Sequence, residues 1–139
     1  MSYATLTDLV ERAGETEILQ ISDRDGDDEA DADVIGAALE DADEEINGYV
    51  GVRYNLPLAT TPRLVTTWAV SIARYRLHRD GAPEHVVKDY DDAIKALKDV
   101  SRGLIAIPDA AGADPATTEG HLSSSPDQVF TPCALGGWR

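Results

Sequence analysis

Apolar side chains recur at spacings of three and four residues through most of the chain before residue 104, a pattern typical of amphipathic helices. Two short segments come first, at residues 5–13 and 15–21. Three longer segments follow, at 33–50, 63–80 and 83–103. Short connections between long helices favour antiparallel neighbours. The pattern therefore predicts an all-α fold, a small antiparallel helical bundle of two short N-terminal helices and three long helices.

The segment at 63–80 is apolar around most of its circumference, which predicts a central helix with Pro62 as its first residue. Before it lies the stretch 46–58, INGYVGVRYNLPL, where the preceding helical pattern ends. Proline there breaks the helix, since it lacks the backbone N–H and restricts the residue before it. We call five residues of this stretch the joint, and expect them to fix the angle between two helices: Arg53, Tyr54, Leu56, Pro57 and Leu58. Contact with a neighbouring subunit is the alternative.

The composition changes after residue 107. Residues 109–128 are rich in Ala, Gly, Pro, Asp, Ser and Thr, and they cannot bury enough apolar surface to order themselves. Four large apolar side chains follow among small residues: Val129, Phe130, Leu135 and Trp138. We therefore expect a helical bundle domain over residues 1–107 and a flexible, extended C-terminal docking tail over 108–139. We call these four apolar side chains the anchors and expect them to dock on another subunit or protein. The alternative is that they fold back on the bundle.

The formal net charge of −14 resides in the first third of the chain. Residues 1–51 hold 16 acidic and 2 basic side chains, whereas the remainder holds ten of each. Five carboxylates form an acidic face beside the apolar stripe of the helix at 33–50: Glu40, Asp41, Asp43, Glu44 and Glu45. Such a face disfavours duplex binding, because affinity for DNA comes mostly from neutralising phosphates. Three interpretations agree with this acidic face: a solvated surface, a channel wall that does not retain DNA, and a DNA mimic that occupies a host nucleic-acid-binding protein.

The run SDRDGDDEADAD at 22–33 is similar in part to a calcium loop. Asp23, Asp25 and Asp27 have the first, third and fifth spacing of an EF-hand. Position six is Asp28 instead of glycine, and position twelve is Val34 instead of glutamate. An acidic loop that leads into a helix N-terminus accounts for the run better than a specific metal site. A weak calcium-binding module is the alternative.

Catalytic signatures are missing from the sequence. It contains no phosphate-binding glycine loop, CxxC pair, HExxH or GxSxG, and its one cysteine, Cys133, has no histidine at a recognisable activating distance. No apolar run is long enough to cross a membrane, and the N-terminus lacks the pattern of a secretory signal. We expect a protein that is not an enzyme, uses no cofactor and does not associate with membranes.

Several short motifs, each present once, follow one another along nearly the whole chain. They are Tyr3-Ala4-Thr5 with Asp8-Leu9; Ile46, Tyr49 and Val50; Arg53-Tyr54; Leu56-Pro57-Leu58; Ile72-Ala73-Arg74-Tyr75 with Leu77; Ala93-Ile94 with Leu97 and Gly103; and Val129-Phe130 with Gly137-Trp138. In this order the chain resembles the Mu-like prophage gp36 proteins, a family found in the head–tail modules of tailed phages. The aspartate-rich insert at 23–33 departs from the family pattern, so the role of this loop stays open.

The resemblance implies a structural role. The family is similar to head–tail connector (adaptor) proteins, small helical bundles that form a ring, usually twelvefold, beneath the portal, through which DNA passes without specific binding. By this resemblance Val129, Phe130, Leu135 and Trp138 would contact the portal protein. The acidic helix or loop would face the channel or the next neck or tail-completion protein. The expected location is the virion neck, and the host cytoplasm during assembly.

Overall fold

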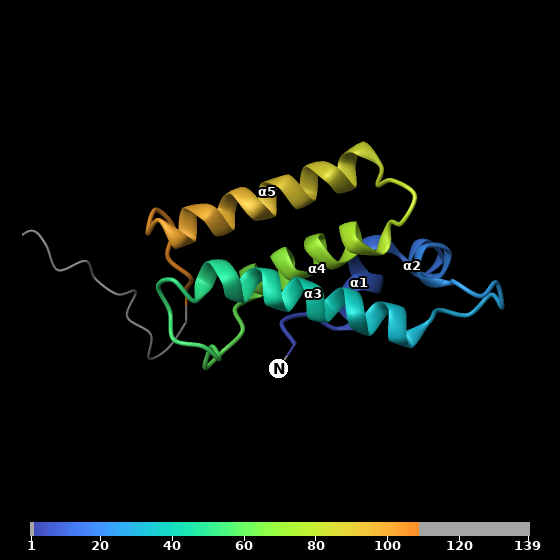
Figure 1. Cartoon of the computed structure of the whole chain (residues 1–139), viewed down its shortest axis with the longest axis horizontal. Helices are drawn as coiled ribbons and strands as arrows, with labels where there is room; N and C mark the ends of the chain where they lie inside the picture. Colours follow the sequence, from blue (N-terminus) through green and yellow to red (C-terminus); the bar gives the residue numbers. More distant parts are fainter. Residues whose placement is uncertain (1, 109–139) are drawn as a thin grey trace, which may run out of the picture.

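The computed structural model describes residues 2–108, which form an all-α bundle without strands (Figure 1). The helices are α1 (Leu6–Ala13), α2 (Glu15–Ser22), α3 (Ala32–Val50), α4 (Arg63–Leu77) and α5 (Glu84–Ser101). Figure 1 shows α3 and α5 running in the same direction and α4 antiparallel to both. The predicted fold class is confirmed, with two short helices before three long ones. The predicted anchors Val129, Phe130, Leu135 and Trp138 lie outside the described residues.

Helix α4 is the centre of the bundle, as its apolar circumference predicted. Nine of its fifteen residues are buried. It packs against α3 on one side, α5 on another and α1 on a third. Trp68 and Ile72 lie in the shared core, with Leu9 from α1, Ile46 from α3 and Leu97 from α5. A helix apolar on several sides is stable only when neighbours cover those sides, and this arrangement supplies them.

The N-terminal helices are held by local signals that the sequence contains. Thr5 caps α1: its hydroxyl accepts from the Asp8 backbone N–H at 3.4 Å, and the Asp8 carboxylate accepts from the Thr5 N–H at 2.8 Å. This reciprocal pair is a capping box, which satisfies two otherwise unpaired donors. Gly14 then separates α1 from α2 at φ +89°, a conformation that favours glycine over other residues. The chain can therefore turn sharply between two short helices.

The ends of α4 differ from the sequence-based prediction. Pro62 is the N-cap in an extended conformation, so the helix begins one residue later, at Arg63. At the other end the helix stops at Leu77 rather than Asp80, because His78 is already extended at ψ 98°. The arginine at position 79 is therefore in the connection to α5, beyond the helix. Within residues 2–108, no helix combines the length and the apolar character that crossing a bilayer requires.

Candidate functional site

The joint divides into packing residues and exposed residues. Tyr54 is 4% exposed, and its hydroxyl accepts a hydrogen bond from the backbone N–H of Ile107 at 3.0 Å. Leu58 is also buried, at 4% exposed. Leu56 is 41% exposed, and Pro57 beside it is exposed as well. Tyr54 and Leu58 therefore tie the segment to the core and to the end of the described chain, whereas Leu56 and Pro57 face outward.

The Arg53 side chain packs against the turn that follows α5. Gly103 follows this helix at φ +76°, and a Cβ placed on it would lie 2.5 Å from Cζ of Arg53. The glycine thus permits both the backbone conformation and the close approach of the guanidinium. The Nε of Arg53 is buried and has no hydrogen-bond partner among the described residues. Arg53 therefore acts here as a spacer between the joint and the last turn after α5.

A hollow of about 290 Å³ opens beside the joint. Its lining comes from Tyr3 and Asn47 together with Leu56, Pro57 and Leu58. The Tyr3 hydroxyl donates to Oδ1 of Asn47 at 2.5 Å, and the Tyr3 backbone N–H donates to Asp43 at 3.0 Å. Burial and the nearby Asp43 charge raise the pKa of the Tyr3 phenol, so it stays a donor. The N-terminal segment thereby becomes one wall of the hollow.

The predicted acidic face is split between solvent and internal partners. Glu40, Asp41 and Glu44 are exposed. Asp43 accepts from Tyr3, and Glu45 accepts from Arg76 and from the Tyr90 hydroxyl, both at 3.0 Å. The bond from Arg76 forms an ion pair that ties α3 to α4. Three of the five carboxylates are therefore available to a partner, and two contribute to packing.

Tyr90 links α5 to the same ion pair. Its ring stacks on Tyr75 of α4, with ring centroids 4.1 Å apart and an interplanar angle of 13°. Burial, followed by the hydrogen bond to Glu45, raises the pKa of the Tyr90 hydroxyl. A stacked pair of this kind contributes about 1 kcal/mol beyond its buried area. The α3–α4–α5 contact is thus fixed by side chains that the sequence pattern alone did not pair.

A buried ion pair locks α2 onto α4. Both Nε and Nη2 of Arg74 donate to the Glu17 carboxylate, at 2.6 and 2.7 Å, and the arginine side chain is only 8% exposed. His85 Nε2 lies 3.3 Å from Nη2 of Arg74, and His78 Nε2 lies 3.5 Å from Glu17. The hydrogen bond from Arg74 is the main cause that lowers the pKa of Glu17. The signal available in the sequence was an arginine, Arg74, among the apolar residues of this helix, but it did not identify Glu17 as the partner.

The aspartates of the 23–31 loop mainly organise the loop itself. Carboxylate oxygens of Asp23, Asp25 and Asp27 lie within 4.8 Å of one another. Asp23 accepts from the backbone N–H groups of Gly26 and Asp28 at 2.6 and 3.2 Å, and the Gly26 bond lowers its pKa. Partial desolvation and repulsion from Asp27 raise the pKa of Asp25. The aspartates at the first, third and fifth positions of the EF-hand spacing do lie close together, but their carboxylates accept hydrogen bonds from the loop's own backbone. Positions six and twelve still lack the glycine and the glutamate of a calcium loop.

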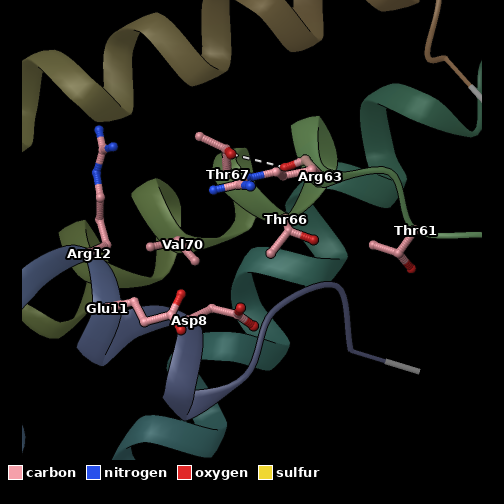
Figure 2. Close-up of a pocket in the computed structure, with 8 residues that line it drawn as sticks. All are labelled: Asp8, Glu11, Arg12, Thr61, Arg63, Thr66, Thr67 and Val70. Carbon is pink, nitrogen blue, oxygen red and sulfur yellow. Dashed lines mark hydrogen bonds between the residues drawn. The ribbon is translucent and has the colours of Figure 1, made fainter.

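A groove of about 570 Å³ lies between α1 and α4 (Figure 2). Figure 2 shows Asp8, Glu11 and Arg12 on the α1 side. The opposite side carries Thr61, Arg63, Thr66, Thr67 and Val70. Asp8 is already used in the capping box, the Thr67 hydroxyl donates to the Arg63 carbonyl at 2.9 Å, and Arg12 lies 3.4 Å from Asp89 of α5. Three of the lining side chains, those of Asp8, Arg12 and Thr67, thus already have partners.

Comparisons with known proteins agree with the family resemblance. A sequence profile of the family described as "Bacteriophage Mu, Gp36" matches residues 3–125. The chain is 31% identical over 104 residues to "Gene product J" of Escherichia phage Mu, and the match covers 74% of each chain. It is 41% identical over 70 residues to "Mu-like prophage FluMu protein gp36" of Haemophilus influenzae, a match that spans 50% of each chain. The profile match ends before Val129, so the four predicted anchors lie beyond it.

Proposed function

The chain belongs to the bacteriophage Mu Gp36 family, and from this premise we propose that it is a head–tail connector (adaptor). In this role, copies of the chain form a ring beneath the portal that joins head to tail and lines the DNA channel. Family membership is the observation that carries the proposal, since it makes the chain a phage protein. The compact all-α bundle supports a part that works by stoichiometric assembly.

The exposed acidic residues of α3 suit the wall of such a channel. Glu40, Asp41 and Glu44 are exposed and form no ion pair within residues 2–108, whereas Glu45 is paired with Arg76. Proteins bind DNA largely by neutralising its phosphates and releasing counterions. A carboxylate surface offers no such neutralisation and repels the backbone. DNA would therefore pass along this face without being retained.

The C-terminal anchors would supply the contact with the portal protein. Val129, Phe130, Leu135 and Trp138 are large apolar side chains in a segment otherwise rich in small residues. Buried aromatic side chains contribute most of the free energy in many protein interfaces. A segment that becomes ordered on binding loses conformational entropy, and the large apolar area of the four anchors would offset this loss. The other face of the ring would contact the next neck or tail-completion protein.

Binding to the portal protein of the same phage element tests this role. We would mix purified portal with the full chain and with a variant in which Val129, Phe130, Leu135 and Trp138 are all serine, then measure complex formation by size-exclusion chromatography with light scattering. The matched control replaces three serines of the same segment, Ser123, Ser124 and Ser125, with alanine. The full chain and the control should bind, and the anchor variant should remain a folded helical protein that does not. Equal binding by the anchor variant would refute the anchoring role.

A second role is favoured by the charge alone. The net charge of −14 and the exposed carboxylates of α3 also suit an acidic regulator that mimics DNA and occupies a nucleic-acid-binding protein. This role leaves the apolar C-terminal residues without a task. Mass spectrometry of purified particles separates the two roles. A connector is present in particles at a fixed ratio to portal, whereas a regulator is found only in the soluble fraction.

A further inference from the structure

Exposed large apolar side chains gather at one end of the bundle. We call this the joint end: the end of α3, the start of α4 and the end of α5, which Figure 1 shows together. Among residues 2–108, Val52 is 66% exposed and Leu56 41%, both in the loop between α3 and α4. Leu64, at the start of α4, is 37% exposed, and Leu104, just after α5, is 73% exposed. Leu6 on α1 is the remaining exposed large apolar side chain in that range, at 45%. Isolated apolar side chains on a surface are ordinary, but a gathered set indicates a contact surface.

The segments that carry these side chains contact one another. The Tyr54 hydroxyl accepts from the Ile107 N–H, and Gly103 lies against the Arg53 guanidinium. Leu56 also lies over Gly51, where a Cβ would be 3.1 Å from Cδ1 of this leucine. The loop after α3 and the segment after α5 therefore lie against each other at the joint end.

The hollow of about 290 Å³ opens on this surface. Leu56, Pro57 and Leu58 supply its apolar lining, and Tyr3 with Asn47 supplies the polar edge. An apolar recess with a few polar groups on its rim is the usual seat of an aromatic anchor in protein recognition. The polar edge also suits the N–H of an indole, which needs an acceptor when it is buried.

The described chain ends at this same surface. Ile107 is buried at 5% exposed beside Tyr54, and the sequence continues from Pro108 for another 31 residues. Residues 109–128 separate this point from Val129, and a linker of such composition spans roughly 25 Å on average. A segment tethered at this distance is present at an effective concentration on the order of millimolar. A second copy of the chain in dilute solution is present at a far lower concentration.

We propose that the joint end is the docking site of this chain's own C-terminal segment, residues 129–138, in the free protein. The indole of Trp138 occupies the hollow, and the exposed leucines cover the rest of the segment. Docking protects both apolar surfaces from water and from nonspecific association. This contact does not require the connector role. If the chain is a connector, a portal must displace the segment from the joint end before it can bind the anchors.

Trp138 reports on the docking directly. The chain has two tryptophans, and Trp68 is buried in α4 at 6% exposed. The fluorescence of the full chain minus that of Trp138→Phe therefore gives the emission of Trp138 alone. We expect this emission to be blue-shifted, with acrylamide quenching severalfold weaker than for a free tryptophan. Dilution of the protein should not change it, since the contact is within one chain.

Single substitutions at the joint end identify the site. Leu56→Asp and Leu104→Asp each remove one apolar contact, which should lower the ratio of docked to free segment by about tenfold and raise quenching of Trp138. Leu6→Asp is the matched control for Leu56→Asp: Leu6 is 45% exposed but lies on α1, outside the joint end, so this change should leave quenching unchanged. Circular dichroism verifies that each variant stays helical. If Leu56→Asp unfolds, Leu104→Asp carries the test because this side chain is 73% exposed.

Three results would overturn the proposal. A fully exposed Trp138 in the unaltered chain means that the segment is not docked. A protected Trp138 that ignores both Leu56→Asp and Leu104→Asp means that it docks elsewhere. Protection that disappears on dilution means that the occupant is a segment from a second copy.

Discussion

Removal of Glu17 should destabilise the bundle more than removal of its partner Arg74. The Arg74 side chain is 8% exposed and the Glu17 side chain 29%. In Glu17→Ala the guanidinium stays buried without a carboxylate, and stranding one member of a buried pair costs about 3 kcal/mol. In Arg74→Met a side chain of similar shape fills the core, and the remaining carboxylate can reach water. This change should therefore cost about 1 kcal/mol.

The double variant Glu17→Ala/Arg74→Met separates pairing from packing. Neither charge remains in it, so it should be no more than about 1 kcal/mol less stable than the unaltered chain. Urea unfolding followed by circular dichroism measures all four proteins. With a slope of about 1.5 kcal/mol per molar urea, Glu17→Ala should lower the midpoint by about 2 M. Equal losses in the two single variants, or a double variant at the sum of both, would refute the picture of a buried cation that depends on Glu17.

Three further predictions follow from individual contacts. The Arg74 bond lowers the pKa of Glu17 from its usual value of 4.5, so the stability it provides is complete above that pH and is lost as pH falls through the lower folded value; unfolding midpoints at decreasing pH should fall more steeply in the unaltered chain than in Arg74→Met. Gly48 lies in α3 with open space around it, so Gly48→Ala should raise the free energy of unfolding by about 0.5–1 kcal/mol. Gly103 has φ +76° and lies against Arg53, so Gly103→Ala should lower the free energy of unfolding by about 1 kcal/mol. Equal shifts of the thermal unfolding midpoint in both variants would contradict this account of Gly103. Replacing Glu40, Asp41 and Glu44 with lysine should lower DNA delivery by assembled particles, whereas replacing the scattered exposed residues Glu11, Glu84 and Asp91 with lysine should not; equal delivery by both triple variants would argue against a channel-facing α3.

The fold was predictable because its signals are local or periodic. The apolar circumference of the 63–80 segment predicted that α4 would be central, and nine buried residues confirm it. Thr5 and Asp8 stand at the spacing of a capping box, and the box is present. The early end of α4 at Leu77 was not predictable from periodicity. Residues 78–80 are polar, and the first helix-ending residue in the sequence is Gly81, but His78 already leaves the helical conformation.

The site was predictable only in part, because side-chain pairing depends on contacts between distant residues. The sequence grouped Tyr54, Leu56 and Leu58 in one joint, but Tyr54 and Leu58 are buried whereas Leu56 is 41% exposed, a difference that depends on where the loop turns. The sequence grouped Asp43 and Glu45 with the outward carboxylates. Their partners Tyr3, Arg76 and Tyr90 lie between 31 and 45 residues away, beyond what helical spacing can indicate.

The hollow at the joint end was not predictable from the sequence either, because its lining comes from distant segments. Two of its walls come from residues 3 and 47, and the third comes from 56–58. No motif in the sequence joins these positions, and only the packing of the N-terminal segment against α3 brings them together. Recesses that form between separate segments have no periodic signature. Sequence patterns thus predicted the helices better than the surfaces between them.

Electron microscopy of particle necks tests the connector role most directly. Particles of the phage element that encodes this chain would be purified and reconstructed at the junction between head and tail. The proposed function predicts a ring of copies of this bundle between the portal and the next neck component, with the exposed side of α3 toward the DNA. A neck that contains portal and tail proteins but no copy of this bundle would contradict it.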